Sequence, residues 1–192
     1  MCLAPVAMLN CSQYFYCMCV NLMNKAHVIE HLKFALEAQL TTAKVAAKTA
    51  HDTATHEENI AENKYDTLGL EAAYLAQGQA QRVNDCYKSM ELFKPIFNQP
   101  ASSKIAIGSL VCLEDTNEQQ KWFYLGPSAG GLTVEVKGLT IAVVTPGAPL
   151  GKLLLNKQID DGISLTIADV KHDYDIVAVS YTHLTLPTTE RV

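Results

Sequence analysis

Acidic side chains are concentrated in one short stretch of the chain. They are Asp52, Glu57, Glu58, Glu62 and Asp66. On a helix the last three would share one face, at i, i+4 and i+8, where like charges cost about 0.2–0.5 kcal/mol per pair. That cost indicates that something other than local helix stability keeps the acids there. The alternative is that acids in a first helical turn favour the helix dipole, which explains Glu57 and Glu58 better than Asp66.

Two histidines, His51 and His56, lie beside these acids. Histidine with carboxylates is a metal-binding combination, but the order H-E-x-x-H is not met because Ile60 stands where the second histidine belongs. Solvated loop histidines are therefore the favoured interpretation. Cys17 and Cys19 also lack a partner pair at zinc-finger distance. We expect the six cysteines to be unpaired thiols in a reducing cytoplasm.

Two helical patterns flank the acidic stretch. In the first, apolar residues recur at three- and four-residue steps, which is one face of a helix. They are Val28, Leu32, Leu36, Leu40, Ala43, Ala47 and Ala50. The second pattern ends near Pro95, which cannot continue a helix interior. It contains Leu68, Ala72, Leu75, Gln79, Val83, Cys86 and Met90.

The connection between the two patterns predicts how the helices are arranged. Residues 51–58 form the predicted bend, and Thr55 and Glu58 have the spacing of a capping box that starts the second helix. A short connection makes antiparallel neighbours of two helices. Each arm would be roughly 40 Å long at 1.5 Å per residue. A two-helix hairpin of that length has little core of its own, so its outer end should project and reach into a partner.

The second half of the chain shows the pattern of strands. Segments with period-2 alternation and β-branched residues lie between Gly and Pro signals, at 132–136, 139–144, 163–167 and 176–179. Lys137-Gly138 predicts a tight turn, and 149–155 predicts one short helix with Pro in its first turn. Strands with one helix predict an α+β domain. The glycine-rich segment 126–131 lacks the ending of a phosphate loop and is interpreted as a connector.

Composition excludes several classes of protein. The chain has 192 residues and a formal charge of −5. It has no basic run, so nucleic acid backbone is not expected to be its main partner. No apolar stretch reaches the ~18–20 residues of a membrane span, so no membrane partner is predicted. Both ends differ in composition from the rest: residues 1–22 are interpreted as a non-native extension before a start at Met23, and residues 181–192 as a non-native tail.

Several segments resemble the bacterial Gre transcript-cleavage and elongation factors. The segment 59–63, Asn-Ile-Ala-Glu-Asn, resembles the family's Asp-Leu-x-Glu-Asn tip, and the match continues to Gly78. The segments 105–111 and 121–126 resemble its first strand pair, and 174–179 its closing strand. The segment 145–152, Thr-Pro-Gly-Ala-Pro-Leu-Gly-Lys, resembles its Ser-Pro turn ending in Gly-Lys. The similarity covers about Met23 to Ser180.

The resemblance implies an α+β protein of two parts. Residues 23–98 would form an N-terminal antiparallel α-helical coiled-coil hairpin, and residues 104–180 a C-terminal FKBP-like antiparallel β-sheet domain with one short helix. The family implies an accessory factor in the bacterial cytoplasm rather than an enzyme. Its hairpin enters the secondary channel of RNA polymerase, and it stimulates the polymerase to cleave backtracked RNA near the RNA 3′ end. We expect a monomer, because the apolar pattern breaks at the acidic bend instead of continuing as heptads.

The resemblance also implies roles for residues at the tip. The factor has no cofactor of its own, and its tip carboxylates help hold Mg²⁺ in the polymerase active site. Glu62 matches the family's tip glutamate and would be the main metal ligand. Asn59 stands where the family has aspartate, so it offers a neutral oxygen without a charge. Glu58 or Asn59 would support Glu62.

Two other functions remain open from the sequence. One is a regulator that binds the same polymerase channel and no longer stimulates cleavage. The other is an FKBP-like isomerase or chaperone with a coiled-coil arm. Isomerase activity needs an aromatic-lined pocket, for which only Trp122, Phe123 and Tyr124 are candidates. Alternating members of that run are the pattern of ordinary core residues in a strand.

Overall fold

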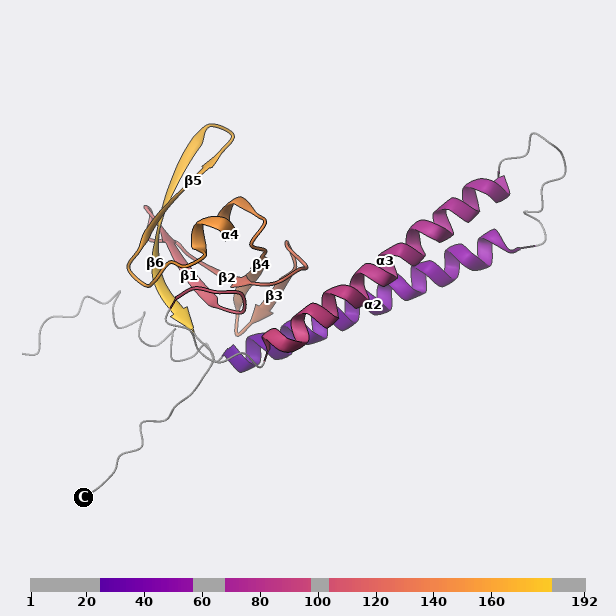
Figure 1. Cartoon of the computed structure of the whole chain (residues 1–192), viewed down its shortest axis with the longest axis horizontal. Helices are drawn as coiled ribbons and strands as arrows, with labels where there is room; N and C mark the ends of the chain where they lie inside the picture. Colours follow the sequence, from indigo (N-terminus) through magenta and orange to yellow (C-terminus); the bar gives the residue numbers. More distant parts are fainter. Residues whose placement is uncertain (1–24, 57–67, 98–103, 181–192) are drawn as a thin grey trace, which may run out of the picture.

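The structure, a computed structural model, describes residues 25–56, 68–97 and 104–180. It begins with two long helices, α2 (Lys25–Ala54) and α3 (Leu68–Ile96), which pack side by side in opposite directions. A six-stranded sheet and one short helix follow. Figure 1 shows the helical pair leading away from the sheet, which lies against one end of it. The predicted fold class, a helical hairpin followed by a strand-rich part with one helix, is confirmed.

The packed face of α2 follows the predicted pattern. Its buried residues recur at three- and four-residue steps because those positions lie on one side of a helix. They are Lys25, Val28, Leu32, Leu36, Leu40, Ala43 and Ala50. Ala47 also lies on this side and is half-buried. The helix spans 30 residues, so it is about 45 Å long at 1.5 Å per residue.

The packed face of α3 differs from the prediction at one position. Leu75, which we expected on that face, is 56% exposed. Its neighbour Ala76 is half-buried instead, together with Ala72 and Gln79. The larger leucine lies to the side because the two helices approach closely there, where small residues fit. The side chain of Leu68 lies outside the described part of the structure.

The sheet contains six strands in the order β3-β4-β2-β1-β6-β5. Their bounds are β1 Leu110–Asp115, β2 Gln120–Leu125, β3 Thr133–Val136, β4 Leu139–Val144, β5 Gly162–Ile167 and β6 Val170–Ser180. The sheet is mixed, so the expectation of a wholly antiparallel sheet is wrong at one pair. β2 and β4 run parallel, with Trp122 opposite Ile141. The hairpin β3–β4 makes this possible, because β3 carries the chain back before β4 joins β2.

The first strand begins later than predicted. We expected a strand over 105–111, but β1 starts at Leu110. The backbone of Ile105 instead exchanges hydrogen bonds with the segment after the short helix, donating to Lys157 and accepting from Asn156. The chain then turns at Gly108, whose φ of +96° favours glycine. The apolar residues before this turn are therefore core residues of a loop.

Both faces of the sheet are covered. One face carries Leu110, Cys112, Trp122 and Tyr124, which share a core with the base of the hairpin. The other face packs against α4 (Pro149–Leu154) and forms a second core. Its buried members are Ile105, Val111, Leu113, Leu125, Leu154, Ile163 and Ile176. The edges of the sheet are β3 and β5. The first residues of β2 and of β6 are also exposed, where the two strands extend beyond the two cores.

The short connections are explained by local chemistry. Lys137 and Gly138 both have positive φ, of 52° and 80°, which is the two-residue turn that matches the twist of a β-hairpin. This confirms the predicted tight turn. Pro149 begins α4, as expected of a residue whose missing N–H is not needed in a first helical turn. The predicted helix over 149–155 is therefore confirmed to within one residue.

Candidate functional site

The residues predicted to carry the function lie in the connection between α2 and α3. Glu58, Asn59 and Glu62 fall outside the described residues, as do Glu57 and Asp66. Their roles therefore stay predictions. The structure does describe both helices that flank this connection in the sequence, and the end of α2 and the start of α3 lie far from the sheet (Figure 1).

The first helix extends into the predicted bend at 51–58 and ends at Ala54. His51 and Asp52 lie in the last turn of α2, and both are exposed. The N–H and the hydroxyl of Thr55 both donate to the carbonyl of His51, each over 3.0 Å. Thr55 thus lies at the end of α2, where its side chain adds a second hydrogen bond to a carbonyl of the last turn. Glu58, the other half of the predicted capping box, is not among the described residues.

The outer half of the hairpin is narrow. The residues between its helices are small, with Ala43 and Ala50 buried on α2 and Ala72 and Ala76 half-buried on α3. Small side chains allow close approach but bury little apolar surface, so this half has a thin core. No sheet residue belongs to it, since the residues of the hairpin that share a core with the sheet lie near its base. The result is a slender rod of two helices, which the acidic segment joins in the sequence.

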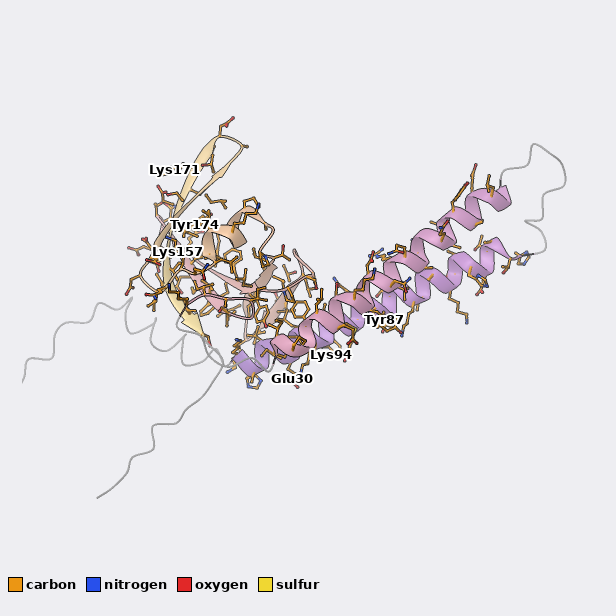
Figure 2. The ribbon with its side chains drawn as sticks, viewed as in Figure 1. Glu30, Tyr87, Lys94, Lys157, Lys171 and Tyr174 are labelled. Carbon is orange, nitrogen blue, oxygen red and sulfur yellow. The ribbon has the colours of Figure 1, made fainter. Side chains whose placement is uncertain are left out.

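The surface of the rod carries several exposed apolar and aromatic side chains. Phe34 and Val45 on α2 and Leu70 and Tyr74 on α3 are more than half exposed. Tyr87, labelled halfway along the hairpin in Figure 2, has the Lys44 ammonium 4.9 Å from its ring centre. Scattered exposed apolar residues are common on soluble proteins. They make the rod surface compatible with a protein partner without identifying one.

The base of the hairpin contains residues that the sequence interpretation missed. Phe93 is fully buried, and its ring stacks on Tyr124 of β2 with the ring centres 6.3 Å apart. The same ring lies 5.4 Å from that of Phe97. Phe93 lies three residues after Met90, the last member of the second apolar pattern. The spacing in the sequence therefore already indicated that Phe93 lies on the packed face of α3. Phe93 connects the rod to the sheet.

Two ionisable groups at this end are perturbed by burial. Burial lowers the pKa of the Lys25 ammonium to about 8, because removal from water disfavours the charged form. The same effect raises the pKa of the Tyr124 phenol above its usual range. At neutral pH the Lys25 side chain, with a pKa of about 8, is still mostly charged, whereas the Tyr124 phenol is neutral. Within 25–56, 68–97 and 104–180, no group of three His, Cys, Asp or Glu could hold a metal ion.

The aromatic run considered for an isomerase pocket is part of the two cores. Trp122 and Tyr124 point to the face that packs on the hairpin, whereas Phe123 points to the opposite face. Side chains on opposite faces of one strand cannot line a common pocket. The interpretation of alternate members as core residues is confirmed. Among the helices that the structure describes, none is long and apolar enough to cross a membrane.

Comparison with known proteins finds similar solved structures. No protein-family model and no curated protein matches the chain. Gfh1 of Thermus thermophilus, described as a homologue of the GreA factor, is 20% identical with a TM-score of 0.32, over 76% of this chain and 92% of that one. Gfh1 of Thermus aquaticus is also 20% identical, with a TM-score of 0.34, over 75% of this chain and 90% of that one.

A third similar structure is described as a prokaryotic transcription elongation factor GreA/GreB, from Nitrosomonas europaea. It is 21% identical with a TM-score of 0.33, and the match covers 44% of this chain and 65% of that one. The chain is thus similar to solved structures of Gre-type factors, the family that its sequence motifs resemble.

Proposed function

We propose that this protein is an accessory factor of bacterial RNA polymerase that inserts its helical hairpin into the secondary channel. The observation that carries the proposal is the slender rod, which is anchored to a sheet at one end and whose two helices are joined in the sequence, at the other end, by the acidic segment. Two helices side by side are about 20 Å across, at 10–12 Å per helix. A hairpin of this shape can place the residues at its outer end in a deep and narrow site that a globular domain cannot enter.

The proposed activity is stimulation of the polymerase's own cleavage of backtracked RNA. Glu62 would bind Mg²⁺ in the polymerase active site through its carboxylate, with Glu58 or Asn59 supporting it. Carboxylate oxygens suit this ion, which keeps several of its waters when bound. The chemistry that the ion supplies there is activation of water for phosphodiester hydrolysis. The factor's own contribution is to carry the carboxylate to the site and hold it there, so it is not itself a nuclease.

A second function is favoured by one specific residue. Asn59 replaces the aspartate of the family's tip, and an amide contributes no charge to a cation site. If one carboxylate is not enough, the protein binds the channel and regulates transcription without stimulating cleavage. The two functions share the hairpin and the partner and differ only in the chemistry of the tip.

Binding is tested first, by capture of core RNA polymerase with the full chain. We expect one factor per polymerase, and competition with a second ligand of the secondary channel. A chain that fails to bind polymerase, while its circular dichroism shows an intact helical hairpin, contradicts both functions and leaves the isomerase or chaperone interpretation. In that event, prolyl isomerisation of a model peptide is the next measurement.

Cleavage is then measured in stalled elongation complexes. We expect the parent chain to release short RNA 3′ fragments and Glu62→Ala to reduce the rate at least tenfold with unchanged polymerase affinity. Glu30→Ala is the matched control, because Glu30 is an exposed acid at the opposite end of the hairpin (Figure 2). A parent without activity, in which Asn59→Asp produces cleavage, identifies the non-cleaving regulator instead.

A further inference from the structure

The contact between the rod and the sheet is built around one aromatic ring. Phe93 lies on α3, one helical turn before that helix ends at Ile96. It is fully buried in a core that also contains Val28, Leu32 and Leu36 of α2. These are the residues through which the hairpin enters the core of the sheet. Phe93 is the α3 member of this set, and it stacks on Tyr124 at the centre of the sheet.

The space for this ring depends on a glycine of the sheet domain. Gly126 follows β2, and a Cβ atom added to it would lie 3.0 Å from Cζ of Phe93. The same atom would lie 2.8 Å from Cγ1 of Val143 and 3.2 Å from the carbonyl oxygen of Ser128. Carbon atoms in ordinary contact are about 3.5–4.0 Å apart, so any side chain at this position would displace the ring or the strand beside it.

A small change at this contact is amplified along the rod. The axis of α3 between Leu68 and Phe93 is about 38 Å long, at 1.5 Å per residue. A tilt of roughly ten degrees at the base therefore moves the outer end by about 7 Å. Among the described residues, those of the hairpin that share a core with the sheet lie near its base. The direction of the hairpin is consequently decided at its base.

We propose that Phe93 is the positioning residue that fixes the direction of the hairpin relative to the sheet. Gly126 makes this possible, because its lack of a side chain leaves room for the Phe93 ring. Phe97 supports the arrangement, since its ring contacts Phe93 and has the Lys33 ammonium of α2 5.1 Å from its centre. The assignment concerns geometry within this chain and stands independently of the proposed function. If the hairpin does enter a polymerase channel, Phe93 also sets where its tip arrives.

The test measures the separation between the hairpin and the sheet domain in the full chain. Spin labels are attached through unnatural amino acids at Lys48 on α2 and Lys152 on α4, both exposed, because the six cysteines make thiol labelling unspecific. Pulsed electron resonance then gives the distribution of label separations. We expect one narrow distribution in the parent chain, and a shifted or clearly broadened one in Gly126→Ala and in Phe93→Ala. Phe93→Leu should broaden the distribution less than Phe93→Ala does. This variant replaces Phe93→Ala in the test if Phe93→Ala does not fold.

Two controls separate direction from stability. Gly78→Ala adds the same methyl group to α3 at a position where a Cβ meets nothing within 4 Å, so the distribution should not change. Leu154→Ala removes a fully buried side chain from the second core. It should lower the melting temperature while leaving the distribution as in the parent. Folded Phe93→Leu and Gly126→Ala chains with the parent's distribution would overturn the assignment.

Discussion

At the scale of single residues, the least expected feature is the buried phenol of Tyr124. Its side chain is fully buried, and its hydroxyl has no hydrogen-bond partner among the described residues. Leaving such a group unpaired costs about 1–3 kcal/mol, because the hydroxyl loses its bonds to water and gains none in return. The ring itself is useful, since it stacks on Phe93. The hydroxyl is therefore the destabilising part of a stabilising side chain.

This separation gives a prediction for Tyr124→Phe. The substitution keeps the stacked ring and removes the unpaired hydroxyl, so we expect the free energy of unfolding to rise by about 1 kcal/mol. Chemical denaturation measures it, with Tyr87→Phe as the control at an exposed tyrosine, where the change should stay within about 0.5 kcal/mol. A loss of stability in Tyr124→Phe would mean that the hydroxyl has a partner after all.

The sequence predicted the residues of α2 better than those of α3. On α2 the apolar spacing is regular, and burial follows it from Val28 to Ala50. On α3 the spacing predicted that Leu75 faces α2. Close packing of two helices depends on the size of the side chains as well as on their spacing, and the smaller Ala76 is half-buried there instead. Periodicity alone contains no information about the distance between helices. The tip residues Glu58, Asn59 and Glu62 lie outside the described residues, so their prediction is neither confirmed nor contradicted.

At the scale of elements, the turn before α4 depends on a close backbone contact. A Cβ added to Gly151 would lie 2.0 Å from the carbonyl oxygen of Thr145, which is far inside contact distance. That carbonyl accepts the N–H of Ala148 and so closes the turn that begins α4. The chain thus folds back onto its own helix at a position where only glycine fits. This explains why the Thr-Pro-Gly-Ala-Pro-Leu-Gly segment needs a glycine inside its helix, where glycine is otherwise unfavourable.

Gly151→Ala should therefore be strongly destabilising. We expect a loss of about 3 kcal/mol or more, because neither the carbonyl nor the helix can move without breaking the turn. Gly147→Ala is the matched control in the same turn, since its added Cβ would be 4.0 Å from the nearest atom, Oγ1 of Thr145. Urea unfolding of the two variants gives the comparison. Equal stability of both would show that the turn can relax, contrary to this argument.

The sheet shows which features of elements could not be predicted. Alternation along β6 places Ile176 and Ala178 on the same face, yet they belong to different cores. The reason is a bulge: Ala178 pairs with Cys112 and Ile176 with Leu113, which leaves Val177 without a partner in the register with β1. A bulge is created by pairing between distant strands, so local alternation does not contain it. The parallel pairing of β2 with β4 is unpredictable for the same reason.

At the scale of the whole molecule, the hairpin and the sheet are joined by a common core. Val28, Leu32 and Phe93 come from the helices, and they are buried together with strand residues such as Leu110 and Ile141. The two parts could be distinguished in the sequence by the repeat of their apolar residues, which is about 3.6 residues in the helices and about 2 residues in the strands. How the two parts contact each other could not be predicted, because the contact joins residues separated by long stretches of chain. The shared core makes each part depend on the other for stability.

A single cooperative unfolding transition is the consequence that can be measured. The chain has one tryptophan, Trp122, which is 5% exposed and belongs to the shared core on the sheet side. Its fluorescence reports on the sheet, whereas far-ultraviolet circular dichroism reports mainly on the helices. We expect the same denaturation midpoint by both probes, because a sheet that loses the hairpin would expose its apolar face.

Leu32→Ala tests the direction of this dependence. Leu32 lies on α2 and is fully buried, so its truncation should cost about 2–5 kcal/mol. With a shared core, the fluorescence of Trp122 on the distant strand shifts its midpoint by as much as the helical signal does. Ala50→Gly, in the outer half, should cost only about 1 kcal/mol and shift both signals slightly. If Leu32→Ala moved the helical midpoint alone, the hairpin and the sheet would be independent units, and the direction of the rod would not be fixed by its base.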